Sequence, residues 1–280
     1  MDSDETRIFL IDNGSLRPEA TLVLRRLASE LSVRFGRRVD PVSLLHSDKA
    51  PVSELGGCPA CVLEPEMRRL ARDEGVRRFI LVPFFLGASR AITEYMPKVA
   101  ARVSEEAGLD MDVRVADPLA GPDMESPDPR LIDALVDEAR TAMQREAWQR
   151  PTVALVDHGT PEPSVNRLRQ AVTAQLAARL GEDVEQVIAA SMERRAGPEY
   201  DFNEPLLENL QAPDRVGGQN LIVALFFLLP GRHAGPGGDV VEICDGLKER
   251  NIFRRIVRTS LLCERPELPA ILEDRILSVD

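Results

Sequence analysis

The sequence predicts an α/β protein of two tandem, doubly wound modules, each with a four-stranded parallel sheet flanked by helices. Three observations predict this fold class. Continuous runs rich in Val, Ile and Leu alternate with amphipathic helical stretches along the 280 residues. These runs do not alternate apolar with polar residues, which is typical of strands buried on both faces. The second half also repeats landmarks of the first half in the same order, which indicates a tandem duplication.

Each half opens with a short apolar run that ends in Asp-X-Gly-Ser/Thr and leads into a turn containing proline. A Glu-Pro pair and a Phe-Phe-Leu strand end follow in both halves. The repeated landmarks are Asp12-Asn13-Gly14-Ser15 and Asp157-His158-Gly159-Thr160, Glu64-Pro65 and Glu204-Pro205, and Phe84-Phe85-Leu86 and Phe226-Phe227-Leu228. We place the seam near residues 144–151, and we therefore expect one domain over residues 1–147 and another over residues 148–280.

Strand and helix alternate within each half, so we expect right-handed crossovers between parallel strands. The expected strands cover residues 7–11, 39–45, 78–85 and 112–116 in the first half, and 152–156, 184–190, 220–227 and 255–259 in the second. The expected helices cover residues 131–148 at the end of the first half, and 165–180, 204–210, 239–250 and 267–277 in the second. In the common strand order 2-1-3-4, the first and third strands are neighbours.

The chain is acidic, because 46 Asp and Glu residues outnumber 35 Lys and Arg residues and give a formal net charge of −11. Such a chain has no general attraction for nucleic acid or an anionic membrane. No apolar run is long enough to span a bilayer, and the acidic residues 1–5 are unlike a secretory signal. Four cysteines are too few for a disulfide framework at this length. We expect a reduced, cytoplasmic protein.

Two of the three histidines follow strand ends in the second half. His158 comes directly after the first strand, and His233 lies in the loop after the third. Because ligands of open α/β sheets bind beyond the carboxyl ends of the strands, we expect both imidazoles at one crevice. Two neutral imidazoles form a partial site for a divalent metal and a pair of bases near neutral pH.

The alternative for these histidines is that each merely binds a backbone carbonyl in its loop. The first half provides a comparison, because Asn13 stands where the second half has His158, and Ala91 stands where it has His233. The scaffold landmarks persist there without the imidazoles, so the fold alone does not require them. This difference favours a function in the second half.

The loop that carries His233 is rich in glycine. Its backbone near Gly231 can approach a flat ligand closely, and Arg232 can bind a carboxylate through two hydrogen bonds. The next helix begins at Asp239, which is expected to be its N-cap. A flexible connection without a ligand is the competing interpretation of the glycines.

These residues resemble the sirohydrochlorin chelatases of the CbiX and SirB type, the class II chelatases of siroheme and cobalamin synthesis. The resemblance rests on Asp157-His158-Gly159-Thr160, on Glu204-Pro205, and on Phe226-Phe227-Leu228 leading to Gly231-Arg232-His233-Ala234. It covers nearly all of the chain as two chelatase-like modules, of which the first lacks the metal histidines. In the family, two histidines at these positions hold the metal and assist its insertion, so the resemblance implies those roles for His158 and His233.

The resemblance implies an enzyme, a chelatase of the lyase class, that inserts a divalent metal into sirohydrochlorin or a related tetrapyrrole. Cobalt, iron and nickel are the candidate metals, with cobalt or ferrous iron preferred, and no organic cofactor is expected. Histidine suits this chemistry because it accepts a proton and binds metal weakly enough to release it. A non-catalytic relative that binds a tetrapyrrole or a metal is the alternative. A hydrolase using Asp157, His158 and Thr160 is a third hypothesis, but it lacks a convincing catalytic triad.

Further residues are candidates for the same site. The expected substrate-binding residues are Arg232, Gly231, Thr160 and Arg194, and Arg195 is a further candidate. For Arg194 and Arg195, a solvated loop charge is the competing interpretation. Glu204 is a candidate third ligand or proton acceptor, although Glu and Pro also suit the first turn of a helix. The family usually has His-Gly-Ser-Arg where this chain has His158-Gly159-Thr160-Pro161.

Two other features carry weaker signals. Cys58-Pro59-Ala60-Cys61 is a lone C-x-x-C, which is either a redox or metal pair or an unrelated loop sequence. His46 is expected to be a strand-end histidine bonded within its loop.

The two repeats are expected to pack as a pseudo-dimer, in a monomer or a homodimer. Residues of the first half are then expected to line the pocket, namely Asn13, Ser89, Arg90 and Tyr95.

Overall fold

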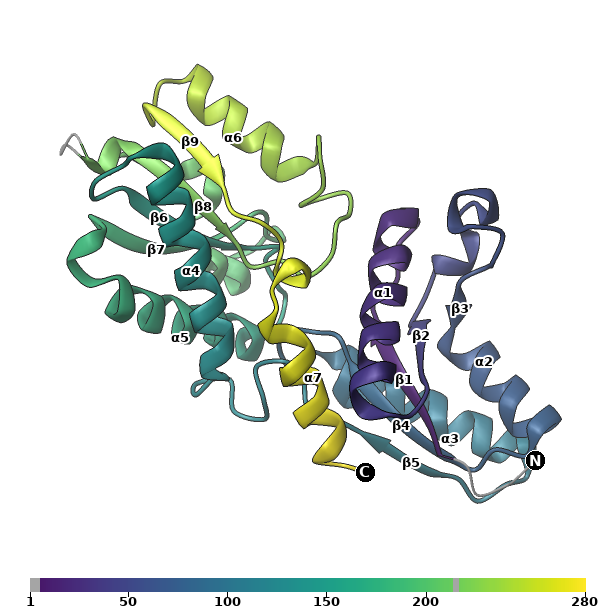
Figure 1. Cartoon of the computed structure of the whole chain (residues 1–280). Coiled ribbons are helices and arrows are strands. Elements are labelled where there is room, and N and C mark those ends of the chain that lie inside the picture. The colour runs from purple at the N-terminus through teal and green to yellow at the C-terminus, as the bar shows by residue number, and fades with distance from the viewer. Residues whose placement is uncertain (1–5, 214–216) are drawn as a thin grey trace. The chain divides into compact units, whose positions relative to one another are not determined.

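The computed structural model describes residues 6–213 and 217–280 and confirms the α/β class, with two parallel sheets flanked by helices (Figure 1). The chain divides into two compact units. The first unit comprises the chain up to Pro122 together with Leu268–Asp280, and the second comprises Asp123–Glu267. Within the described ranges, every helix is too short or too polar to serve as a membrane span.

The sheet of the first unit has five parallel strands in the order β3-β2-β1-β4-β5. These strands are β1 (Thr6–Asp12), β2 (Val39–Ser43), β3 (Cys61–Val62), β4 (Arg78–Pro83) and β5 (Asp112–Val115). The four longer strands confirm the strands predicted from the apolar runs. The sequence does not predict β3, because two residues paired with the end of β2 are too few to show a pattern.

Both faces of this sheet are covered, as the continuous apolar runs require. Phe9 and Ile11 of β1 pack in one core cluster with α2 (Leu63–Arg69) and α3 (Met96–Ala107). Alternate residues of a strand point to opposite faces, and Ile8 and Leu10 are also fully buried. Three more helices are α1 (Pro18–Phe35), which packs on β1 and β2, and the π-helical turns Leu70–Glu74 and Ala91–Tyr95.

The sheet of the second unit has four parallel strands in the order β7-β6-β8-β9, which confirms the expected order 2-1-3-4. Its strands are β6 (Thr152–Asp157), β7 (Gln186–Ser191), β8 (Asn220–Leu225) and β9 (Arg255–Arg258). Its helices are α4 (Pro129–Glu146), α5 (Pro163–Leu180) and α6 (Asp239–Glu249). Pro18 and Pro163 each begin the helix after the first strand of their unit, where the fixed φ of proline is favourable.

The last helix of each sequence repeat lies in the other compact unit. Helix α4 ends the first repeat but belongs to the second unit, whereas nearly all of α7 (Glu267–Leu277) belongs to the first. Arg275 of α7 donates hydrogen bonds to the carbonyls of Pro118 and Leu119, at 3.0 Å each. The expected domain boundary between residues 147 and 148 therefore marks where one sequence repeat ends and the next begins. The compact units are divided after Pro122 and after Glu267 instead.

The helix predicted over residues 204–210 is wrong. Glu204-Pro205 forms a cis peptide bond, and the segment holds short 3-10 turns at Pro198–Asn203 and Leu207–Asn209 instead. Leu206 is extended and forms a parallel bridge with Ser191 at the end of β7. The equivalent pair Glu64-Pro65 lies inside α2, so the same two residues adopt different structures in the two repeats.

Candidate metal and tetrapyrrole site

The two histidines of the second unit meet at the carboxyl edge of its sheet. His158 follows the last residue of β6, and His233 lies in the loop between β8 and α6. Strands β6 and β8 are hydrogen-bonded neighbours, and the two ring centroids are 4.4 Å apart with an interplanar angle of 73°. The structure thus brings the two imidazoles together, as expected from their positions after strand ends.

A carboxylate orients the His233 ring. His233 Nδ1 lies 2.6 Å from Asp239 Oδ2, within a side-chain pair that is about two-thirds buried, with exposed fractions of 34% and 32%. When Nδ1–H donates to Asp239, the ring is held in the tautomer that leaves the lone pair of Nε2 free for a metal ion. Asp239 is the first residue of α6 and Gly238 is the N-cap, so the predicted N-cap at Asp239 is wrong by one position.

The His158 ring is oriented by its own turn and by a second carboxylate. His158 Nδ1 lies 3.2 Å from the carbonyl of Gly159, and Nε2 lies 3.4 Å from Glu193 Oε1. Sequence reasoning misses Glu193, because it follows β7 in a loop without any motif. The Glu193 side chain is 60% exposed, so it can exchange protons with solvent.

Gly159 makes the turn at His158 possible. Its φ is +93°, and a Cβ atom at this position would lie 1.9 Å from the carbonyl oxygen of Glu193. Gly14 has the same arrangement in the first unit, with a φ of +92° and a Cβ position 1.7 Å from the carbonyl oxygen of Leu45. Only glycine fits such an approach, so the glycine of Asp-X-Gly belongs to the scaffold of both units.

Buried polar side chains lie beneath the turn. Arg169 of α5 is fully buried and forms an ion pair with Asp157, with 2.9 Å between Nη1 and Oδ1. The Asn203 side chain accepts from the Thr160 N–H at 3.0 Å and donates to the Thr160 carbonyl at 2.8 Å. Sequence reasoning misses Arg169 and Asn203, because one lies in a helical pattern and the other in a segment predicted to precede a helix.

Arg232, Arg194 and Glu204, which were also predicted for the site, differ in their contacts. Arg232 is 79% exposed, and its Nε lies 3.8 Å from Asp239 Oδ2. Arg194 is bonded to Glu204 at 2.8 Å and to Asp201 at 3.1 Å, so its charge is already balanced within the protein. No contact of Glu204 with either histidine occurs among the described residues.

Thr160 supports the turn rather than a nucleophilic function. Its hydroxyl oxygen accepts a hydrogen bond from the N–H of Glu162 at 3.0 Å, just before α5. Gly231 lies in the loop before Arg232, and its carbonyl accepts from the N–H of Gly235 at 2.9 Å, which folds the loop back on itself. This hydrogen bond from the Glu162 N–H to the Thr160 hydroxyl does not support the hypothesis of a hydrolase that uses Thr160.

The set of possible ligands around the two histidines is small. Within residues 6–213 and 217–280, no group of three or more His, Cys, Asp and Glu side chains is arranged to hold a metal ion. Two histidines leave most coordination positions of a divalent ion to water or to another ligand. Such an open site suits a metal that is passed on rather than kept.

The first unit lacks the imidazoles at its corresponding edge. Asn13 follows β1, and Ala91 begins a π-helical turn that leads into α3. His46 is exposed, with a φ of +67°, in the loop after β2. Asp12 is only 3% exposed, and this burial raises its pKa to about 6, although bonds from Ser43 and Gly14 lower it.

The C-x-x-C pair lies in the first unit, at the edge of its sheet. Cys58 and Cys61 are exposed free thiols, and both line a cavity of about 180 Å³. Burial of the sulfur, followed by the nearby charge of Glu66, raises the pKa of the Cys61 thiol, which makes it a weaker nucleophile. Arg25 donates to the carbonyl oxygens of Cys58 and Pro59 and fixes the loop.

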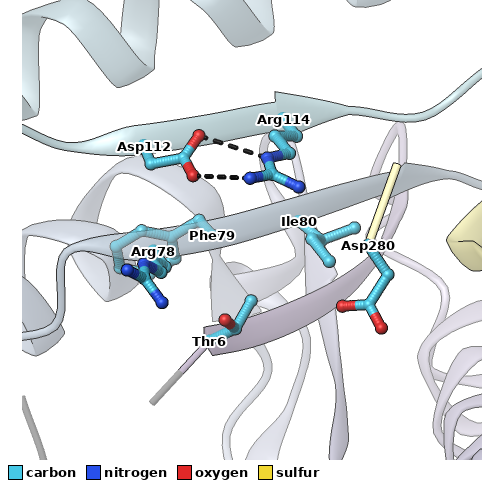
Figure 2. A pocket seen from close by; sticks show the side chains of 7 residues that line it. All are labelled: Thr6, Arg78, Phe79, Ile80, Asp112, Arg114 and Asp280. Atoms are coloured by element: carbon cyan, nitrogen blue, oxygen red, sulfur yellow. Dashed lines mark hydrogen bonds and ion pairs between the residues drawn. The ribbon is translucent and has the colours of Figure 1, made fainter. Parts of the chain in front are cut away.

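A further cavity, of about 280 Å³, lies where the strands of the first unit begin (Figure 2). Its lining residues are Thr6, Arg78, Phe79, Ile80, Asp112, Arg114 and Asp280. The ion pair between Arg114 and Asp112, at 3.0 Å, lies on β5 at its rim. Because ligands of parallel sheets bind at the carboxyl ends, this cavity at the amino ends is not the expected crevice.

The fold and the crevice define a two-unit α/β protein with a pair of imidazoles at the carboxyl edge of one sheet. The CbiX family model matches residues 7–142, and this match confirms the resemblance inferred from the sequence. The match lies on the repeat without the histidine pair. A comparison with the curated proteins found no match.

Solved structures of chelatases share the fold over the whole chain. SirB from Bacillus subtilis with Fe³⁺ has a TM-score of 0.66 and 14% identity, and covers 98% of this chain and 95% of its own. SirB from Bacillus subtilis subspecies spizizenii in complex with cobalt has a TM-score of 0.65 and 13% identity, with 98% and 94% covered. CbiX of denitrifying bacteria has a TM-score of 0.60 and 12% identity, with 97% and 98% covered.

Proposed function

We propose that the protein is a chelatase that inserts a divalent metal, cobalt or ferrous iron, into sirohydrochlorin or a related tetrapyrrole. The match to the CbiX family model supports a function of the sirohydrochlorin chelatase type, and the fold shared with SirB and CbiX agrees with it. The observation that carries the proposal is the pair of imidazoles 4.4 Å apart at the carboxyl edge of the second sheet. The SirB structures with Fe³⁺ and with cobalt support a metal ion as a substrate.

The first step is capture of the metal by the two histidines. His233 offers Nε2, because its Nδ1 is bonded to Asp239. His158 offers a second nitrogen from the other side of the crevice. Neutral imidazoles bind divalent cobalt and iron, and two ligands leave positions at which ring nitrogens can replace water.

The second step is removal of two protons from the macrocycle. A metal M²⁺ replaces the protons of two pyrrole N–H groups, so each turnover releases two H⁺. An imidazole that gives up its metal bond is a base near neutral pH and can accept such a proton. Glu193, 3.4 Å from His158 Nε2, stabilises the resulting imidazolium and faces solvent.

The third requirement is to hold an acidic macrocycle beside the metal. Arg232 precedes His233, is largely exposed, and has only a long ion pair of 3.8 Å with Asp239 among the described residues, so it can bind a ring carboxylate. The Gly231 backbone lies directly before it and permits close approach. Arg194 contributes less to the net attraction, because a ring carboxylate there competes with Asp201 and Glu204.

Absorbance spectra test this proposal, because metal insertion changes the spectrum of a tetrapyrrole. Purified protein is mixed with sirohydrochlorin and Co²⁺, Fe²⁺ or Ni²⁺, and the rate above the uncatalysed reaction is measured. We expect His158→Ala and His233→Ala each to reduce this rate by about 100-fold or more, as for removal of a catalytic base. His46→Ala in the first unit is the matched control and should retain the wild-type rate.

Two outcomes contradict the proposal. If the His158→Ala, His233→Ala double variant inserts metal at the wild-type rate, the crevice is not the site. If the wild-type protein accelerates insertion with none of the metals but binds the macrocycle in a spectral titration, the protein is a tetrapyrrole carrier instead.

A further inference from the structure

The side chain of Arg169 is fully buried in the second unit, and it is the largest such side chain. A buried guanidinium is costly unless charged and polar partners surround it. Its Nη1 forms the ion pair with Asp157 Oδ1 at 2.9 Å and donates to the hydroxyl of Ser191. Its Nη2 donates to the carbonyl oxygens of Phe202 and Asn203, at 3.3 and 3.4 Å.

These partners lie on three segments that lead into the candidate site. Asp157 ends β6 and directly precedes His158, and its Oδ1 also accepts from the N–H of Gly159 at 3.1 Å. Ser191 ends β7, two residues before Glu193. The Phe202 and Asn203 carbonyls end the 3-10 turn before Glu204. One guanidinium therefore joins the turn of His158 to the end of β7 and to the 3-10 turn before Glu204.

The first unit shows that the fold forms without this guanidinium. Asp12 and Ser43 are paired in register just as Asp157 and Ser191 are. Leu24 occupies the seventh position of α1, which corresponds to Arg169 in α5. Asp12 is buried there, and its Oδ1 has no hydrogen-bond partner among the described residues. The arginine is thus present in the unit with the two imidazoles and absent from the unit without them.

We propose that Arg169 is a positioning residue that holds the turn of His158 in the conformation that places its ring against His233. This inference rests on the proposed function for its catalytic meaning, but its structural content does not need a metal. The guanidinium fixes Asp157, Asp157 fixes the Gly159 N–H, and the turn then presents the imidazole. Arg169 is 0% exposed and therefore touches neither metal nor macrocycle.

Substitution of Arg169 alone leaves the Asp157 charge buried without a partner, and such a variant is expected to unfold. The test therefore uses the double variant Asp157→Asn, Arg169→Met, which removes both charges and keeps similar volumes. Asp12→Asn, Leu24→Met is the matched control at the corresponding positions of the first unit. Arg169→Lys with Asp157 retained is the conservative variant, because it restores the charge without the planar fork.

The first measurement is an NMR contact between the two rings in the metal-free, full-length chain. The protein has three histidines, so selective isotope labelling resolves each imidazole, and His46 is the internal reference. Rings with centroids 4.4 Å apart give a strong nuclear Overhauser effect between them. We expect the double variant to lose this signal, the Lys variant to retain part of it, and the control to keep it fully.

The second measurement is the affinity for Co²⁺ by absorption titration. We expect the double variant to bind Co²⁺ about 10- to 100-fold more weakly, as is typical when a partner that orients a metal ligand is lost. If the double variant is folded and keeps both the ring contact and the Co²⁺ affinity of the wild type, the inference is overturned. If the wild type binds neither Co²⁺ nor Fe²⁺, the proposed function fails, and the ring contact still decides the role of Arg169.

Discussion

The two units hold the aspartate that ends the first strand in different electrostatic surroundings. Asp157 forms an ion pair with the buried Arg169. The corresponding residue in the first unit is Leu24, which offers no positive charge to Asp12. Desolvation alone accounts for the raised pKa of Asp12, since no charged side chain contributes to the shift. A single position on the first helix therefore decides whether a carboxylate at the sheet edge is stabilised in its charged form.

Asp12 makes the stability of the first unit depend on pH. The pKa of Asp12 is raised to about 6 in the folded chain from an ordinary value of 3.8, so the folded state favours the protonated form. The contribution of Asp12 to the stability of the folded state is fully present below the ordinary pKa of 3.8, and it is lost as the pH rises through about 6. The loss is about 3 kcal/mol once Asp12 is ionised.

Asp12→Asn removes this pH dependence. We expect the variant to be more stable than the wild type at about pH 8, by up to about 3 kcal/mol, and to lose most of this advantage at about pH 4. Urea unfolding at both pH values, followed by a probe in the first unit, measures the difference. An advantage of the same size at both values contradicts the assignment.

A second prediction concerns the partner of His233. Asp239→Asn weakens the hydrogen bond at Nδ1 that orients the His233 ring, so we expect Co²⁺ affinity to fall by about 10-fold or more. Asp245→Asn on the same helix is the control, because that carboxylate is exposed and pairs only with Lys248. Equal Co²⁺ affinity in the two variants, measured by competition with a chelator, contradicts a role of Asp239 in metal binding.

At the scale of the elements, the tight turn after the first strand determines where the histidine is placed. The carbonyl of Glu193 occupies the space of a Cβ at Gly159, and the positive φ excludes most other residues. We expect Gly159→Ala to destabilise the protein by about 2 kcal/mol or more and to abolish metal insertion, since the turn must move. The free energy of unfolding and the insertion rate are both measured.

Gly246→Ala is the matched control for this glycine. Gly246 lies inside α6 with open space around its Cβ position, so alanine there should stabilise the helix by up to about 1 kcal/mol. Loss of insertion activity in this control would show that activity responds to any change in the unit, and not to the turn.

The sequence predicts the regular elements well and the irregular ones poorly. Buried parallel strands produce continuous apolar runs, so the sequence predicts the eight longer strands and the helices α4 to α7 with ends within a few residues. The segment around Glu204 is not predicted, because its conformation depends on the bridge between Leu206 and Ser191, a contact distant in the chain. The histidine pair was predictable since topology places strand ends together, whereas Glu193 and Arg169 depend on tertiary contacts that no motif marks.

At the scale of the whole molecule, the compact units and the sequence repeat do not coincide. Helix α7 completes the first unit although it ends the second repeat. Its apolar side chains Leu268, Ile271, Leu272 and Ile276 are all fully buried. Since burial of each such side chain contributes about 1.5–3 kcal/mol, α7 supplies a large share of the stability of the first unit.

A chain that ends at Glu267 tests this division. We expect its first unit to lose protection against hydrogen exchange in β1 and β4, while β6 and β8 stay protected, because α7 belongs to the first unit. A chain that ends at Leu277 keeps α7 and serves as the control. Loss of protection in β6 and β8 instead would show that residues 148–280 form the folding domain.

The placement of α4 and α7 bears on how such a chain could arise by duplication. A solitary repeat with this connectivity would leave its closing helix without a sheet of its own, and would need a second copy to receive it. Two separate copies could fold only by exchanging their closing helices, and both the folding rate and the stability would then depend on the concentration of the copies. Joining them in one polypeptide removes that dependence, and one copy can then change the residues at its sheet edge while it still packs against the closing helix of the other copy.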